Sequence, residues 1–123
     1  MNLKKKLFLF DLDGVICKNT KYKSSNLINY KKSKSIPSAV RAINKLYDDG
    51  HTIVIYTARG MTRYKGNVSL IKKKLSKLTV NSLKSWKLKY HKLVFGKIYY
   101  DLIIDDKSIN YKSDWTKNIF KKN

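Results

Sequence analysis

Two aspartates one residue apart follow an apolar run near the beginning of the chain. A strand is predicted over residues 3–10, and its apolar end, residues 7–10, is expected to be buried and to emerge at Asp11. In an extended strand the side chains of Asp11 and Asp13 would point to the same side, unless the chain turns between them, and Gly14 permits such a turn. Burying two carboxylates beside an apolar strand is costly without a cation, and a hard divalent ion such as Mg²⁺ binds such oxygens. A calcium loop is disfavoured because residues 15–17 are Val, Ile and Cys, where that loop needs oxygen ligands.

A second strand is predicted over residues 51–57, which are largely β-branched and apolar and end at Thr57. The intervening residues 37–48 have helical apolar spacing. That helix begins at the single proline, with a serine on either side able to cap it, and stops at Gly50. Strand, helix and strand in this order predict a right-handed crossover and a parallel sheet. The strand ends at Asp11 and Thr57 should therefore face the same edge of the sheet.

A third group of polar residues lies nearer the C-terminus. The apolar residues 102–104 predict a strand that ends in Asp105 and Asp106, and Lys97 lies between this run and Thr57 in the sequence. Phosphoryl transfer needs a nucleophile, a proton donor, a metal that neutralises phosphate charge, and donors that hold the phosphate oxygens. The predicted strand ends offer residue types for all four tasks.

The rest of the chain predicts connecting elements of an α/β domain. Residues 18–35 are polar with little periodicity, and we expect a flexible flap or loop over the site, with an ordinary surface loop as the alternative. The lysines at 72–77 are expected to form the solvated face of a helix without a further role. The remaining predicted elements are a helix over 68–78, a helical turn over 81–86, a short strand over 93–95 and a C-terminal helix over 113–120.

Length and cysteine content restrict the class of protein. A chain of 123 residues with 42% hydrophobic residues predicts one domain, over residues 1–123. The one cysteine, Cys17, excludes an intramolecular disulfide and a cysteine-rich metal cluster, which fits a reducing cytoplasm. The apolar run at 7–10 is too short for a signal peptide or a membrane span. We therefore expect a cytoplasmic protein without membrane association.

The formal net charge of +20 raises the question of an anionic partner. Arginine occurs only at Arg41, Arg59 and Arg63, and lysines are spread from Lys4 to Lys122, which is typical of a lysine bias over the whole sequence. A basic nucleic-acid-binding module is the less favoured alternative because RNA-binding signatures are not evident. In either case a positive field would concentrate anionic substrates near the site.

Taken in order, these motifs resemble those of the haloacid dehalogenase (HAD) superfamily of aspartate-nucleophile phosphatases. The family motifs run Asp-x-Asp-Gly, then Thr or Ser after a strand, then Lys, then an acidic pair, and all four have counterparts within residues 7–106. Residues 53–60 and 93–107 look like those of small phosphatases associated with capsular polysaccharide biosynthesis. The resemblance implies a three-layer Rossmann-like α/β fold with a mainly parallel sheet and only a minimal cap or flap.

The resemblance also implies roles for the first two motifs. Asp11 would attack phosphorus and form an aspartyl phosphate. Asp13 would protonate the leaving oxygen, activate water for the second step and offer its backbone carbonyl to Mg²⁺. Thr57 would hydrogen-bond the transferring phosphate, together with the backbone amide of Ala58.

The last two motifs would supply charge. Asp105 and Asp106 would hold Mg²⁺ together with Asp11 and Asp13. The lysine that neutralises phosphate charge is best placed at Lys97, only eight residues before Asp105, so the other candidates are left open: Lys92 and Lys89.

By this resemblance, we expect a magnesium-dependent phosphomonoesterase acting on a small phosphorylated substrate, a sugar phosphate or related metabolite of surface polysaccharide biosynthesis. Arg59 and Arg63 are candidates for contacts with the distal part of the substrate, and a solvated loop is the equal alternative. Without a large cap the site would be open, so a nucleotide or polynucleotide-end phosphatase is the alternative enzyme.

Overall fold

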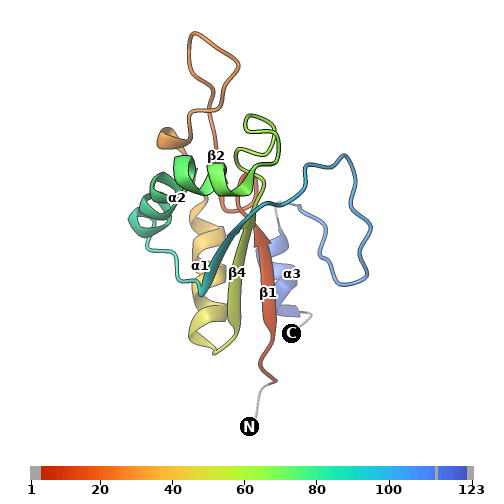
Figure 1. Cartoon of the computed structure of the whole chain (residues 1–123). Helices are drawn as coiled ribbons and strands as arrows, with labels where there is room; N and C mark the ends of the chain where they lie inside the picture. Colours follow the sequence, from red (N-terminus) through yellow and green to blue (C-terminus); the bar gives the residue numbers. More distant parts are fainter. Residues whose placement is uncertain (1–3, 113, 122–123) are drawn as a thin grey trace.

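A computed structural model describes residues 4–112 and 114–121 and contains a parallel three-stranded sheet in the order β1-β4-β5 (Figure 1). The register places Asp11 opposite Tyr56 and Thr57 opposite Phe95, so all three strands end at one edge, the carboxyl edge. The predicted parallel pairing of the first two strands is confirmed. The strands are β1 (Leu7–Asp11), β4 (Thr52–Thr57) and β5 (Lys92–Phe95).

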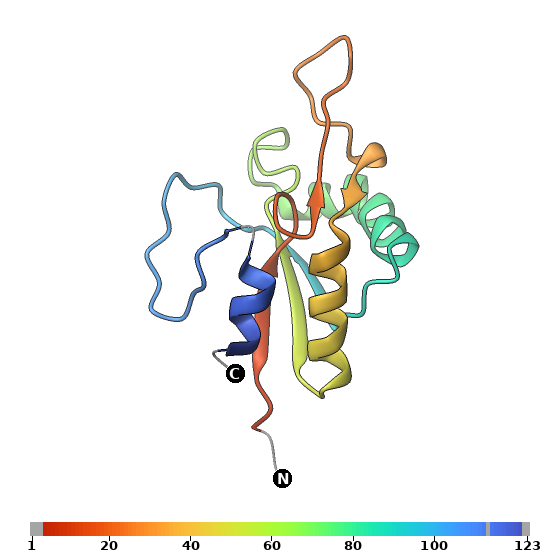
Figure 2. The same cartoon turned by 180° about the vertical axis from the view of Figure 1, so that it is seen from behind.

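Helices α1 (Pro37–Asp48) and α3 (Trp115–Lys121) pack on the same face of the sheet (Figure 2). Alternate strand residues bury this face, among them Phe10 and Ile55, whereas Leu9 on the opposite face of β1 is 58% exposed. The α/β class is therefore confirmed, but helices do not cover both faces of β1. None of the described helices has the length and apolar character that a membrane span requires.

The start of α1 differs from the expected serine cap. Ile36 occupies the N-cap position, and no side chain caps the helix. Pro37 is the first helical residue and has no N–H group to satisfy, while the Ile36 carbonyl accepts bonds from the amides of Ala39 and Val40. The backbone N–H of Ile36 also donates to the Ile16 carbonyl at 2.8 Å, which fixes the start of the helix beside the first motif.

Helix α2 (Val68–Ser85) is one continuous helix where two separate segments were predicted. Asn67 caps its start by accepting a hydrogen bond from the Leu70 amide at 3.1 Å. Its buried residues include Ile71, Thr79 and Leu83. Thr79 lies between the two predicted segments, 68–78 and 81–86, and is buried within the continuous helix.

Residues 17–35, called the flap below, leave the carboxyl edge and return to it. Strands β2 (Cys17–Lys18) and β3 (Lys34–Ser35) pair antiparallel at its base, and the 3₁₀ helix η1 (Tyr30–Lys32) precedes the return strand. Figure 1 shows the excursion rising above the sheet. The flap predicted over 18–35 is therefore a paired excursion that begins at Cys17.

The strand predicted to end at Asp105 does not form. Residues 98–112 make a loop that extends to one side of the sheet (Figure 1), and it pairs with no strand in the described part of the chain. Leu102 is 79% exposed and Ile104 is 92% exposed. The prediction rested on apolar content, but a strand also requires a neighbour with which to share backbone hydrogen bonds.

Candidate active site

Asp11 and Lys97 meet at the carboxyl edge. Lys97 Nζ lies 3.4 Å from Asp11 Oδ1, and both side chains are partly buried. Asp11 Oδ1 also accepts a hydrogen bond from the Leu12 amide at 2.9 Å, which orients the carboxylate. Asp11 thus presents its second oxygen, Oδ2, at the end of β1 with a cation beside it.

The connection after β5 explains how Lys97 reaches Asp11. Gly96 has a φ of +97°, a conformation that favours glycine, and a Cβ there would lie 3.1 Å from a methyl group of Val68. The Lys97 amide then donates to the Thr57 carbonyl at 3.2 Å, which continues the pairing with β4. Lys97 is therefore held next to the strand end rather than free in a loop.

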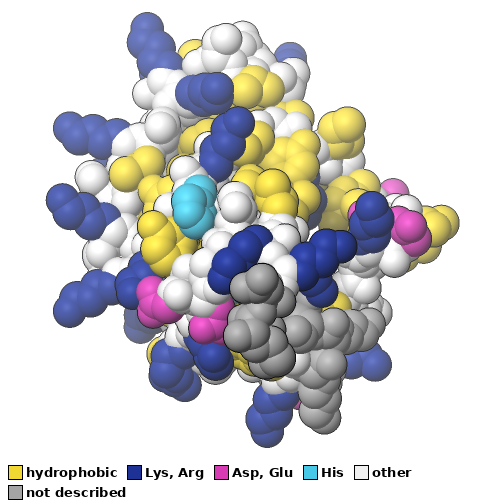
Figure 3. Space-filling model, turned by 90° about the horizontal axis from the view of Figure 1, so that it is seen from below, with side chains coloured by type: hydrophobic (Ala, Val, Ile, Leu, Met, Phe, Trp, Pro, Cys, Tyr) yellow, Lys and Arg dark blue, Asp and Glu magenta, His cyan; other side chains and the backbone are white. Residues whose placement is uncertain are grey.

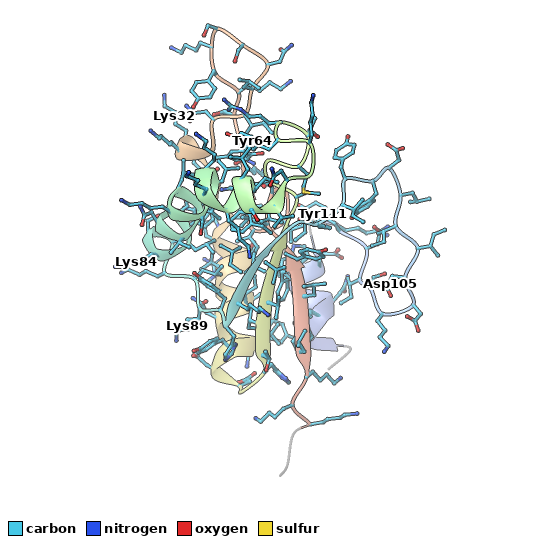
Figure 4. All side chains as sticks on the ribbon, viewed as in Figure 1. Lys32, Tyr64, Lys84, Lys89, Asp105 and Tyr111 are labelled. Carbon is cyan, nitrogen blue, oxygen red and sulfur yellow. The ribbon has the colours of Figure 1, made fainter. Side chains whose placement is uncertain are left out.

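The two other candidate lysines lie elsewhere. Lys92 is the first residue of β5 and Lys89 precedes it, at the end of the sheet opposite the carboxyl edge. Lys89 pairs with Asp48 at 2.7 Å, and Figure 4 shows it far from the loop that carries Tyr64. Of the three lysines, the structure brings only Lys97 to Asp11.

Asp13 is bound by Arg59. Arg59 Nε lies 3.1 Å from Oδ1 and 3.0 Å from Oδ2, and Nη2 lies 2.8 Å from Oδ1. Asn19 from the flap donates to the same Oδ1 at 2.7 Å, and the Cys17 sulfur lies 3.4 Å from it. The Asp13 carboxylate therefore accepts hydrogen bonds from Arg59 and from residues of the flap.

Arg59 does not occupy the substrate-contact position expected from the sequence. Its side chain is fully buried, and its Nη1 donates to Thr79 Oγ1 of α2 at 3.2 Å. Its guanidinium also packs on the Tyr30 ring, 4.3 Å from the ring centre. In the described arrangement protein partners enclose the Arg59 guanidinium, so it does not project outward toward the distal part of a substrate. Arg63 is exposed beside the Tyr64 ring.

The surroundings of Asp13 also change the chemistry of nearby groups. Burial, reinforced by the Asp13 charge, raises the pKa of the Cys17 thiol to about 12. The same two causes raise the pKa of Tyr30. Because the thiolate is the reactive form, Cys17 is a poor nucleophile here.

Thr57 and Ala58 stand next to each other at the end of β4. Thr57 is fully buried, and its Oγ1 accepts a hydrogen bond from the Arg59 amide at 3.1 Å. Ala58 is half-buried, and its carbonyl accepts from the Met61 amide.

The structure does not bring Asp105 and Asp106 to the edge. Both are exposed in the 98–112 loop, and Figure 4 shows Asp105 well away from the sheet. No group of three or more Asp, Glu, His or Cys side chains in the described residues is placed to hold a metal ion. Since Asp105 and Asp106 lie in the exposed loop and not beside Asp11, the expected Mg²⁺ ligand set does not fit the arrangement described here.

Sequence reasoning missed the second set of partners around Asp13. Asn19, Ser33 and Tyr30 come from the polar flap, and Thr79 comes from α2. None of them belongs to a spaced motif. The available signal was the buried polar position within the α2 stripe, which requires a hydrogen-bonding partner.

Comparison with other proteins identifies a crystal structure that has the same fold. No protein-family model matches the chain, and no curated protein sequence is significantly similar to it. A crystal structure of a target protein from Vibrio cholerae is similar, with 23% sequence identity and a TM-score of 0.74. The match covers 97% of this chain and 98% of that one, so the two share a fold over their whole length.

Proposed function

We propose that the protein is a phosphomonoesterase in which Asp11 is the nucleophile, within a HAD-type fold. The observation that carries this proposal is the partly exposed Asp11 carboxylate at the end of a parallel strand, with Lys97 Nζ 3.4 Å away. A carboxylate and a lysine so placed can attack a phosphate ester and neutralise its charge.

The chemistry divides into two steps. Asp11 Oδ2 attacks phosphorus, the bond to the ester oxygen breaks, and Asp13 gives that oxygen its proton. Water, with its proton taken by Asp13, then attacks the phosphorus of the aspartyl phosphate and releases Asp11 and inorganic phosphate. Lys97 stays beside the phosphoryl oxygens in both steps.

Magnesium dependence remains part of the proposal without a step assigned to the metal. HAD-type chemistry implies Mg²⁺, but Asp105 lies in the exposed loop, so no mechanistic role is derived for it from this arrangement. The proposed substrate is a small phosphorylated metabolite such as a sugar phosphate, by resemblance to the small capsule-associated phosphatases.

A phosphate-release screen tests the proposal. Sugar phosphates, nucleotides and 3′-phosphorylated oligonucleotides are compared with and without Mg²⁺, using Asp11→Asn protein as the blank. Release that is fastest from a sugar phosphate and absent from the blank supports the proposal. Release from none of these esters contradicts it.

A second candidate, a polynucleotide-end phosphatase, is favoured by a lysine-lined groove. The groove has a volume of about 580 Å³ between η1 and α2, and no acidic residue occurs between Asp49 and Asp101. No ion pair found in the described chain involves a groove lysine. Its lining contains no aromatic residue, so it would recognise a phosphate chain by charge rather than by base stacking. The lining residues are Lys31, Lys73, Lys74, Lys77, Leu78, Asn81, Ser82 and Ser85.

The salt dependence of oligonucleotide binding distinguishes binding in the groove from attraction of the oligonucleotide to positive charge elsewhere on the surface. Figure 3 shows Lys and Arg side chains projecting around the face it presents, so positive charge is not confined to the groove. Four groove contacts with single-stranded DNA predict a slope of about −3 for log K against log salt. The triple Lys→Glu variant at 73, 74 and 77 should lose most of that slope, whereas the same change at 107, 112 and 117 should keep it. Equal losses in both variants would exclude a groove-specific site.

A further inference from the structure

Arg59 joins three parts of the molecule that lie far apart in the sequence. It binds Asp13, 46 residues away, and it reaches α2 through Thr79 and the flap through Ser33. The guanidinium is fully buried, yet each of its three nitrogens has an acceptor. A lysine could not make this set of bonds, because its single ammonium lacks the planar arrangement of donors.

The two oxygens of Asp13 are used unequally. Oδ1 is surrounded by Arg59 Nε and Nη2, Asn19 Nδ2 and the Cys17 sulfur. Within the described chain, Oδ2 has a hydrogen bond from Arg59 Nε alone. Oδ2 therefore has fewer protein partners than Oδ1, which anchors the carboxylate.

The flap is bound to the same carboxylate. Asn19 donates to Asp13 Oδ1, Ser33 donates to Asn19 Oδ1, and Arg59 Nη2 lies 3.3 Å from Ser33 Oγ. The Tyr30 ring covers the guanidinium. The contacts that orient Asp13 thus run through both ends of the flap.

We propose that Arg59 is a positioning residue, which orients Asp13 for proton transfer through Oδ2. Because Arg59 also binds the flap, the flap closes and Asp13 becomes oriented at the same time. The catalytic part rests on the phosphomonoesterase function proposed above. The link between Arg59, Asp13 and the flap does not, because it can be measured without any substrate.

Leaving-group dependence tests the catalytic part. An alkyl phosphate needs its leaving oxygen protonated, whereas p-nitrophenyl phosphate has a leaving group that departs with little help. The ratio kcat/KM includes phosphoryl transfer but not the later hydrolysis, so it isolates the acid step. We expect Arg59→Ala to lower kcat/KM about 100-fold or more for the alkyl phosphate and less than 10-fold for p-nitrophenyl phosphate, on the scale of general acid catalysis.

Two matched variants complete this comparison. Arg41→Ala removes an exposed arginine of α1 and should change neither substrate's kcat/KM. Arg59→Lys keeps the charge but not the donor geometry, and it should restore only part of the alkyl phosphate activity. Equal losses on both substrates would show that Arg59 supports the fold alone and would overturn the catalytic part.

Cys17 reports on the flap independently of activity. It is the only cysteine, it is buried, and it touches both Asp13 and Arg59. The rate at which a neutral disulfide reagent such as 4,4′-dithiodipyridine modifies it at pH 8 therefore measures opening of this cluster. We expect at least a tenfold faster reaction in Arg59→Ala than in wild type or Arg41→Ala.

If Arg59→Ala does not fold, a variant with substitutions in the flap provides the same test. The double variant Asn19→Ala, Ser33→Ala removes partly exposed flap contacts and leaves the buried Arg59–Asp13 pair. It should also speed Cys17 modification and show the larger loss for the alkyl phosphate. If wild type hydrolyses no ester, the proposed function fails while the thiol measurement still tests the link. An unchanged thiol rate in the folded variants would overturn that link.

Discussion

Lys97 Nζ lies 3.4 Å from Asp11 Oδ1, although 86 residues separate the two in the chain. The parallel register puts both at the carboxyl edge, and Gly96 turns the backbone there. A phosphate dianion bound beside Asp11 would bring several negative charges together. Lys97 is the cation that the described arrangement places next to them.

Removing this lysine should therefore impair turnover. We expect Lys97→Ala to lower kcat roughly a hundredfold, on the scale of losing one preorganised charge contact. Lys89→Ala at the other end of the sheet and Lys117→Ala on α3 should leave kcat near wild type. Steady-state phosphate release measures kcat for each variant. A wild-type kcat for Lys97→Ala together with a strongly lowered kcat for Lys89→Ala would mean that the motif lysine was assigned wrongly.

Metal dependence is a separate prediction. We expect a chelator to abolish phosphate release and Mg²⁺ to restore it, since HAD-type phosphoryl transfer implies a divalent ion. Full activity of metal-stripped protein would show that the reaction does not require Mg²⁺. The proposed mechanism would then depend on Asp11 and Lys97 alone.

Cys17 predicts a specific loss of stability at alkaline pH. The folded thiol has a pKa of about 12, whereas the unfolded thiol titrates near its ordinary value of about 8.5. Between these values the unfolded chain binds fewer protons than the folded one. The free energy of unfolding then falls by about 1.4 kcal/mol per pH unit from this group.

Urea unfolding of wild type and Cys17→Ala at pH 8 and pH 10 measures this effect. Lysine titration is common to both proteins, so the difference between them isolates the thiol. We expect wild type to lose about 2 kcal/mol more than the variant over this interval. Parallel pH dependences would show that the pKa of the folded thiol is not raised.

The sequence predicted the parts of the fold whose signals are local. Residues 37–57 formed the expected helix and strand because periodicity, a proline start and a glycine stop agree there. Lys97 was the preferred motif lysine in the sequence, with Lys92 and Lys89 left open, and the structure places Lys97 beside Asp11.

The features that the sequence did not predict depend on contacts between residues that are far apart in the chain. Arg59 looked like a loop residue, and its burial became clear only with Asp13 and Thr79 beside it. Residues 102–104 look like a strand in the sequence, but a strand depends on a neighbour that the sequence pattern does not reveal. The Asp105 prediction depended on that strand.

The most direct test of the central claim is phosphate release by Asp11→Asn protein on the best ester found for wild type. The amide is nearly isosteric, and its oxygen can still accept the Leu12 amide hydrogen bond, so the fold should persist. We expect no turnover above background from Asp11→Asn protein whose circular dichroism matches wild type and whose mass shows no deamidation. Turnover near the wild-type rate in that protein would contradict Asp11 as the nucleophile.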